Sequence, residues 1–238
     1  MDNSLEKIVK IMHQLRGPNG CPWDKEQDHM SIRNYMIEEV YEVIDAIEAN
    51  NPEYIKEELG DLLFQIIFHC QIGKEQNCFD IQSVLEEISD KMMRRHPHVF
   101  GGNPTNDVNK VLIQWDEIKK TEKNQQNRIS ALDGIPKHLP ALMHAQKALT
   151  KAHQEDILPQ TSPEDTIAHI DRLWNQYKKN SDTSSKQELG LLLLQLAHLA
   201  NLNSDNAEEL LKKEIKEFSD HFKEVEKTSK SRSKGTLG

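Results

Sequence analysis

Acidic residues gather on one face of a short predicted helix. Glu38, Glu42 and Asp45 fall within about 60° of one another at 100° per residue. Glu39 lies beside them. Neither Lys nor Arg occurs between residues 35 and 51, so the repulsion of carboxylates four residues apart, about 0.2–0.5 kcal/mol per pair, is not offset. A hard cation such as Mg²⁺ or Mn²⁺ would remove this repulsion and accept phosphate oxygens, which indicates phosphoryl chemistry.

A second pair of carboxylates follows on the next predicted helix. Glu58 and Asp61 are three residues apart and therefore share a face of that helix. They border the apolar stripe that contains Leu59 and Leu62 rather than opposing it. We therefore expect both carboxylates to be partly buried, where they could complete a metal site.

Two other interpretations fit acidic residues of this kind. A solvated acidic face is the common case for an arbitrary helix with three glutamates. If that face instead docked a basic partner, the protein would be a non-catalytic interaction or regulatory module. Such a module should gain little stability from Mg²⁺ or Mn²⁺. A di-iron bundle needs Glu-x-x-His pairs on two helices, whereas the one such spacing, Glu26 to His29, falls in a predicted loop.

Basic residues could supply the other half of a phosphate site. Lys91, Arg94 and Arg95 close one predicted helix. Cations in a last turn commonly complement the helix dipole, but the guanidinium of Arg95 can also bind two phosphate oxygens at once. Further along, Lys119 follows Trp115, whose indole could stack on a base, although a Trp at this spacing more often belongs to a core. Facing a carboxylate-bound metal, these cations would form a triphosphate clamp.

Helices must position all of these groups, because apolar residues recur at helical spacing along almost the whole chain, as in residues 59–66. No segment shows convincing strand alternation. The chain carries helix start signals at Ser31, Asn51-Pro52 and Asp80, and breaks at residues 17–20, 96–97 and 101–104. The predicted fold class is all-α.

The chain contains an internal repeat. Residues 56–65 (KEELGDLLFQ) match residues 186–195 (KQELGLLLLQ), which indicates two related helical units. Leu191 stands where the first copy has Asp61. We expect an N-terminal domain over residues 1–129 and a degenerate C-terminal domain over residues 130–227, separated near a segment with Gly and Pro. Residues 228–238 are rich in Ser, Lys and Gly and are expected to form a disordered tail.

Charge and composition exclude several classes of protein. The 238 residues carry a net charge of -9, without the Lys/Arg excess that non-specific nucleic-acid or membrane-surface binding requires. No apolar run approaches the roughly 18 residues of a membrane span, and the first residues lack a signal-peptide pattern, so we expect a cytoplasmic protein. Three cysteines without a CxxC pair signal neither a disulfide framework nor a zinc site.

Four runs of sequence together resemble one known family. They are GCPWDKEQ at residues 20–27, EEVYE at 38–42, EELGDLL at 57–63 and RRHPHVF at 94–100. These runs are similar to bacterial MazG proteins of the all-α nucleoside triphosphate pyrophosphatase superfamily. The resemblance implies Mg²⁺-dependent hydrolysis of a nucleoside triphosphate to monophosphate and pyrophosphate, with Mn²⁺ as a substitute ion.

The same resemblance assigns roles to individual residues. It implies that the magnesium ligands are Glu39, Glu42, Glu58 and Asp61. It further implies second-shell or substrate contacts by Glu38 and Glu57, phosphate binding by Lys91 and Arg95, and nucleotide contacts by Trp115 and Lys119. A homodimer that completes four-helix-bundle cores is also implied.

The second half of the chain departs from the family's pattern. Residues 167–172 offer at most one acid where the acidic helix should be, and Glu188 is the one surviving motif carboxylate. The counterparts of Lys91, Arg94 and Arg95 are Glu217, Asp220 and His221. We therefore expect catalysis in the N-terminal half and a structural role for the C-terminal half.

Overall fold

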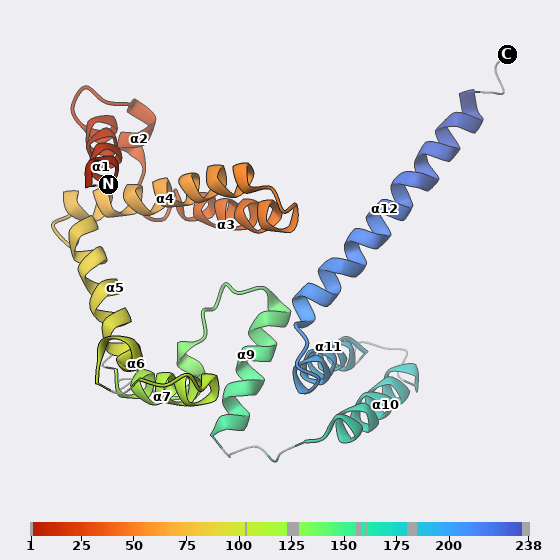
Figure 1. Cartoon of the computed structure of the whole chain (residues 1–238). Helices are drawn as coiled ribbons and strands as arrows, with labels where there is room; N and C mark the ends of the chain where they lie inside the picture. Colours follow the sequence, from red (N-terminus) through yellow and green to blue (C-terminus); the bar gives the residue numbers. More distant parts are fainter. Residues whose placement is uncertain are drawn as a thin grey trace. The chain divides into compact units, whose positions relative to one another are not determined.

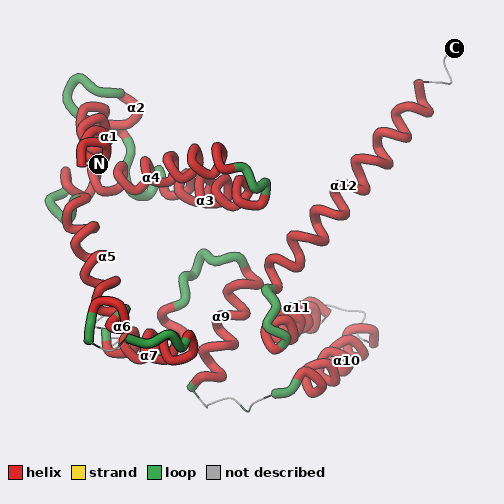
Figure 2. Tube along the Cα trace, viewed as in Figure 1, coloured by secondary structure: helices red, strands yellow, loops and turns green. Residues whose placement is uncertain are grey.

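The chain folds into helices and connecting loops. The computed structural model describes residues 2–102, 104–122, 129–155, 159, 161–179 and 185–234, and this part of the chain contains no strand (Figure 1, Figure 2). The all-α prediction is confirmed. The chain divides into two compact units, Met1–Lys119 and Lys120–Gly238. The division falls about ten residues before the boundary expected from the sequence, and residues 123–128 lie outside the described residues.

The first unit contains seven helices among its described residues. They are α1 (Asp2–Arg16), α2 (Pro22–Glu26), α3 (Arg33–Glu48), α4 (Pro52–Glu75), α5 (Ile81–Arg95), α6 (Pro97–Phe100) and α7 (Val108–Thr121), the last of which ends just beyond the unit.

Local chemistry sets most of these helix boundaries. The side chain of Asn51 accepts hydrogen bonds from the two amides that begin α4, and Pro52 occupies its first turn. Asp80 forms a capping box with Ser83 at the start of α5. After α1, a Cβ on Gly20 would lie 2.0 Å from the Leu15 carbonyl oxygen, so only glycine fits this close approach of the backbone.

The start of α3 differs from the predicted one. Ser31 lies in a turn before the helix, where its hydroxyl accepts a hydrogen bond from the Asp28 amide while its own amide donates to the Asp28 carboxylate. The helix itself begins at Arg33. Ser31 is therefore the partner of Asp28 in this turn. A serine this close to a helix boundary can either cap the helix or form a turn before it, and the sequence does not distinguish the two roles.

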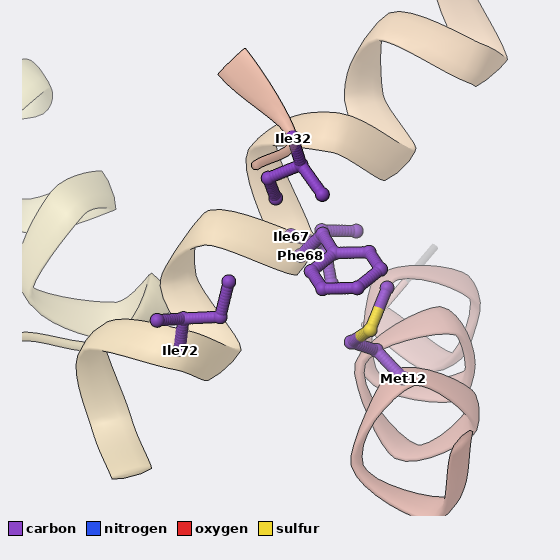
Figure 3. Close-up of a cluster of buried hydrophobic side chains, with 5 residues drawn as sticks. All are labelled: Met12, Ile32, Ile67, Phe68 and Ile72. Atoms are coloured by element: carbon purple, nitrogen blue, oxygen red, sulfur yellow. The ribbon is translucent and has the colours of Figure 1, made fainter. Parts of the chain in front are cut away.

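Helix α4 is the centre of the first unit and packs against two partners. Its N-terminal part pairs with α3, which connects to it through residues 49–51 (Figure 1). Its C-terminal part packs against α1 in a core of Met12, Ile32, Ile67, Phe68 and Ile72 (Figure 3). This core holds one end of the α3–α4 hairpin, because Ile32 immediately precedes α3 and is 1% exposed.

The hairpin also carries an uncovered apolar stripe. Large side chains with exposed fractions between 37% and 56% follow helical spacing on both of its helices: Ile37, Val40 and Ile47 on α3, and Leu59, Leu63 and Ile66 on α4. The carboxylates of the hairpin lie on other faces of the same two helices. This separation of charged and apolar surface on α3 was predicted from the sequence, and the structure contains it.

The second unit repeats the helix pairing of the first. It contains the 3₁₀ helix η1 (Ala131–Gly134) and the helices α9 (Ala141–Gln154), α10 (Pro163–Lys179), α11 (Ser185–Leu202) and α12 (Ala207–Lys234). Helix α11 packs against α10 and α9, as α4 packs against α3 and α1. The repeated segment thus occupies the same place in both units, as the two-unit interpretation requires.

The tail prediction does not agree with the structure over residues 228–234. Helix α12 continues through these residues to Lys234, and residues 235–238 lie outside the described part. The Ser, Lys and Arg residues of this segment do not interrupt a helix that is already formed, and composition alone does not reveal this. No helix in the described ranges is long and apolar enough to cross a membrane.

Candidate metal centre

The α3–α4 hairpin brings three predicted metal ligands together. Glu39 of α3 and Glu58 and Asp61 of α4 each offer a carboxylate oxygen, and these oxygens all lie within 4.8 Å of one another. Glu39 and Glu58 are half-buried. Asp61 is exposed, so the prediction that it is partly buried is wrong, because a position at the border of an apolar stripe can face either the core or solvent. Among the described residues this is the one group of three or more side chains that could hold a metal ion. An all-carboxylate set of this kind fits a hard divalent ion such as Mg²⁺ or Mn²⁺.

The electrostatics of the group favour binding of a cation. Burial raises the pKa of the Glu39 carboxyl above its usual range, and the charges of Glu42 and Asp61 raise it further. Burial likewise raises the pKa of Glu58, with further contributions from Glu42 and Glu57. Both shifts mean that the folded protein disfavours the ionised carboxylates, and a divalent cation between them would reverse that preference.

Glu42, the fourth predicted ligand, lies next to this group without being one of its three members. The Glu42 carboxylate raises the pKa of both Glu39 and Glu58. Glu57 neighbours Glu58 electrostatically, and Glu38 is exposed on α3. These residues thus lie on α3 and α4, two helices that the fold packs together.

The predicted phosphate-binding residues form a second group around α5, α6 and α7. The guanidinium of Arg95 lies over the Trp115 ring, 5.6 Å from its centroid, and His96 packs edge-on against the same ring at 4.8 Å. Lys91 pairs with Glu87 at 3.6 Å. Arg94 and Lys119 are exposed. Since α3 pairs with α4 while α5 packs against α4 and α6, the carboxylates and the cations are built on different helix pairs.

One residue near the carboxylates was missed in the sequence analysis. Gln65, on α4, is half-buried, and its polar side chain opposes the rise in the Glu39 pKa. Its position follows from helical geometry, since it lies one turn after Asp61. The repeat carried a further signal, because Gln195 occupies the same position in the second copy.

The fold and the carboxylate group define a class of all-helical protein with an acidic metal centre between two paired helices. Residues 27–100, which contain this hairpin, match the MazG nucleotide pyrophosphohydrolase domain. The chain is 39% identical to the "Nucleoside triphosphate pyrophosphohydrolase" of Escherichia coli K12 over 231 residues, covering 94% of this chain and 88% of that protein. It is 36% identical to the "Nucleoside triphosphate pyrophosphohydrolase/pyrophosphatase MazG" of Thermotoga maritima, covering 93% and 85% of the two chains.

These relatives are matched along nearly their whole length, so the chain belongs to the MazG family, a family of hydrolases. The crystal structure of a mazG-related protein from Thermotoga maritima aligns with a TM-score of 0.42 at 23% identity, over 48% of this chain and 98% of that chain.

Proposed function

We propose that this protein hydrolyses nucleoside triphosphates to nucleoside monophosphate and pyrophosphate, with Mg²⁺ or Mn²⁺ held by the N-terminal unit. The observation that carries the proposal is the approach of the Glu39, Glu58 and Asp61 oxygens to within 4.8 Å of one another. The relatives named as nucleoside triphosphate pyrophosphohydrolases support it, because they match 94% and 93% of the chain.

The four carboxylates Glu39, Glu42, Glu58 and Asp61 would hold the ion. Their fit rests on their own chemistry: four acidic side chains meet on one hairpin, and the pKa values of Glu39 and Glu58 are raised by burial and by their acidic neighbours. When bound, the ion would supply Lewis acidity toward phosphate oxygens and toward the attacking water. Glu38 and Glu57, on the same two helices, would accept hydrogen bonds from the hydration shell or from the substrate.

The basic group would bind the phosphates. Arg95 can present a bidentate guanidinium, while Lys91 and Lys119 contribute point charges and Arg94 adds a further cation. These residues would stabilise the negative charge that develops on the transferred and leaving phosphates. The Trp115 ring packs against the Arg95 guanidinium. In this proposal Trp115 therefore orients Arg95, which binds phosphate, and also contacts the nucleotide.

We further propose that two copies of the chain form a homodimer through the apolar stripe of the α3–α4 hairpin. A pair of helices with an uncovered row of Ile, Val and Leu side chains can bury that row against an identical pair, which makes a four-helix bundle. The carboxylates lie on other faces of these helices and would stay accessible to substrate.

The test of the proposed reaction is a product analysis. A panel of canonical and damaged nucleoside triphosphates is incubated with the full chain and Mg²⁺, and monophosphate and pyrophosphate are separated from diphosphate and orthophosphate. The proposal expects equal amounts of monophosphate and pyrophosphate, and none when the divalent ion is chelated. Production of diphosphate and orthophosphate, or no turnover of any triphosphate, would contradict it.

A further inference from the structure

The second unit contains a pocket that the proposed hydrolysis does not use. It has a volume of about 410 Å³ and is formed by residues of α9, of α11 and of the segment just before α10. Its lining consists of Thr150, His153, Gln154, Thr161, His198, Asn201 and Leu202. His198 follows Glu188 by ten residues on α11, which places it about 15 Å further along the helix. The pocket is therefore separate from the degenerate metal motif of this unit.

Two of the lining residues are histidines whose rings are stacked. The ring centroids of His153 and His198 are 5.0 Å apart, and the ring planes differ by 10°. His198 is 4% exposed, and its Nε2 lies 2.8 Å from the Thr161 hydroxyl oxygen. The Nδ1 atoms of both histidines are buried, and neither has a hydrogen-bond partner in the described part of the chain. Buried nitrogens without partners destabilise a fold, and a ligand that pairs with them would recover that stability.

The first unit has no histidine at the position of His198. In the register of the repeat, His198 corresponds to Phe68, a buried residue of the first core. The Arg16 guanidinium lies over the Phe68 ring, 5.3 Å from its centroid, as the His153 ring lies over His198. A phenylalanine thus fills this position of the fold without an unpaired nitrogen, so packing alone does not account for His198.

The lining favours a neutral ligand with hydrogen-bonding edges. None of the described lining residues is Asp, Glu, Lys or Arg. Burial and then the neighbouring His153 lower the pKa of His198, so this imidazole is uncharged at neutral pH. A charged ligand would therefore meet no opposite charge. A neutral one could pair with the imidazole nitrogens, with the threonine hydroxyls and with the amides of Gln154 and Asn201.

Nucleobases have these properties. They are flat and neutral, and proteins bind unpaired bases by stacking them on aromatic rings, including His, and by hydrogen-bonding their edges. The volume of the pocket also lies within the range of about 300–1,000 Å³ that is typical of small-molecule sites.

We propose that the second unit binds the base of a nucleoside in the pocket formed around His153 and His198. This binding role goes beyond the hydrolysis proposed for the first unit and does not depend on it. Because the site needs neither a metal ion nor a phosphate, a bound nucleoside should stabilise the protein even when divalent ions are chelated.

The experiment is calorimetric titration of the full chain, in the presence of a chelator, with adenosine, guanosine, cytidine and uridine as probes. At least one of them should bind with a stoichiometry of one per chain. His198→Phe introduces the residue of the first copy, keeps a ring and removes both ring nitrogens. It should weaken binding of that nucleoside at least about tenfold, through loss of a buried hydrogen bond, while the melting temperature without ligand stays equal or rises. His153→Phe should weaken binding as well, and it tests the same point if the first variant folds poorly.

The first unit supplies two controls. His29 and His69 form a similar stacked pair there, with centroids 5.1 Å apart. His69→Phe should leave the nucleoside affinity within about twofold of wild type (a resolution limit, well below the loss of a hydrogen bond). Trp115→Leu removes the ring that the proposed function assigns to the nucleotide, and nucleoside binding to the second unit should persist in this variant.

Four results would overturn the inference. They are no binding of any of the four nucleosides, unchanged binding in both His198→Phe and His153→Phe, an equal loss in His69→Phe, and loss of binding in Trp115→Leu, which would place the base in the first unit. Each is distinguishable from failure of the proposed hydrolysis, because hydrolysis is measured with triphosphates and Mg²⁺ and depends on residues of the first unit.

Discussion

Glu39 of α3 and Asp61 of α4 present carboxylate oxygens within 4.8 Å of each other across the helical hairpin, together with Glu58. Asp61 raises the pKa of both Glu39 and Glu58, so the folded protein holds like charges together at the place where a cation would bind. Binding of a divalent ion should therefore stabilise the hairpin.

Asp61→Asn should separate stability from activity. In the presence of a chelator the free energy of unfolding of the variant should equal that of wild type or exceed it by up to about 0.5 kcal/mol, because the substitution removes one of several repelling charges. Its unfolding temperature should accordingly be equal or slightly higher. Hydrolysis should fall at least about 100-fold, since a charged metal ligand is lost. Thermal unfolding and a turnover assay on the same preparation check both, and a wild-type rate would refute the ligand assignment.

The stability of the first unit should depend on pH through the ionisation of Glu75. It accepts a hydrogen bond from Arg16, whose side chain is 6% exposed, at 2.7 Å, and this contact lowers the pKa of the Glu75 carboxyl. A lowered pKa means that the stabilisation is complete above the ordinary carboxyl pKa of 4.5 and is lost as the pH falls through the folded value.

Glu75→Gln should accordingly cost about 1 kcal/mol at pH 7, a figure discounted because Glu75 is 38% exposed. Urea unfolding of both proteins between pH 7 and pH 3 should show this difference shrinking below about pH 4.5. Glu53→Gln, at a surface pair with 78% exposure, is the control and should change stability by less than about 0.5 kcal/mol. A difference that is independent of pH would contradict the Arg16–Glu75 explanation.

The apolar stripe of the hairpin predicts the assembly state. Wild type should have the mass of a dimer by light scattering at micromolar concentration. Leu63→Glu, at a side chain that is 42% exposed in the single chain, should give a monomer that keeps its helical circular dichroism, because it places a charge in the buried centre of the dimer. Val108→Glu, at a 70% exposed site on α7, should leave the dimer intact. A monomeric wild type would rule out the proposed bundle.

Sequence alone was sufficient for the fold class and for placing Glu58 and Asp61 on one helix, because helical periodicity and capping are local, but not for the exposure of Asp61. It missed Gln65, because the effect of this side chain on the Glu39 pKa acts across the hairpin, and in the sequence Gln65 is one more polar residue beside an apolar stripe. Trp115 was ambiguous for the same reason, since only the fold shows that its ring supports Arg95. The helix through residues 228–234 was missed because composition does not record helix continuation.

The two copies of the repeat allow the most direct test of the N-terminal metal centre. Turnover of nucleoside triphosphates with Mg²⁺ is measured for wild type, Glu42→Gln and Glu188→Gln, with circular dichroism to verify each fold. Glu42→Gln should reduce turnover at least about 100-fold, whereas Glu188→Gln should change it by less than about threefold, because Leu191 stands three residues after Glu188 where Asp61 follows Glu58 in the first copy. If Glu188→Gln proves as damaging as Glu42→Gln while the fold is preserved, catalysis does not reside in the N-terminal unit.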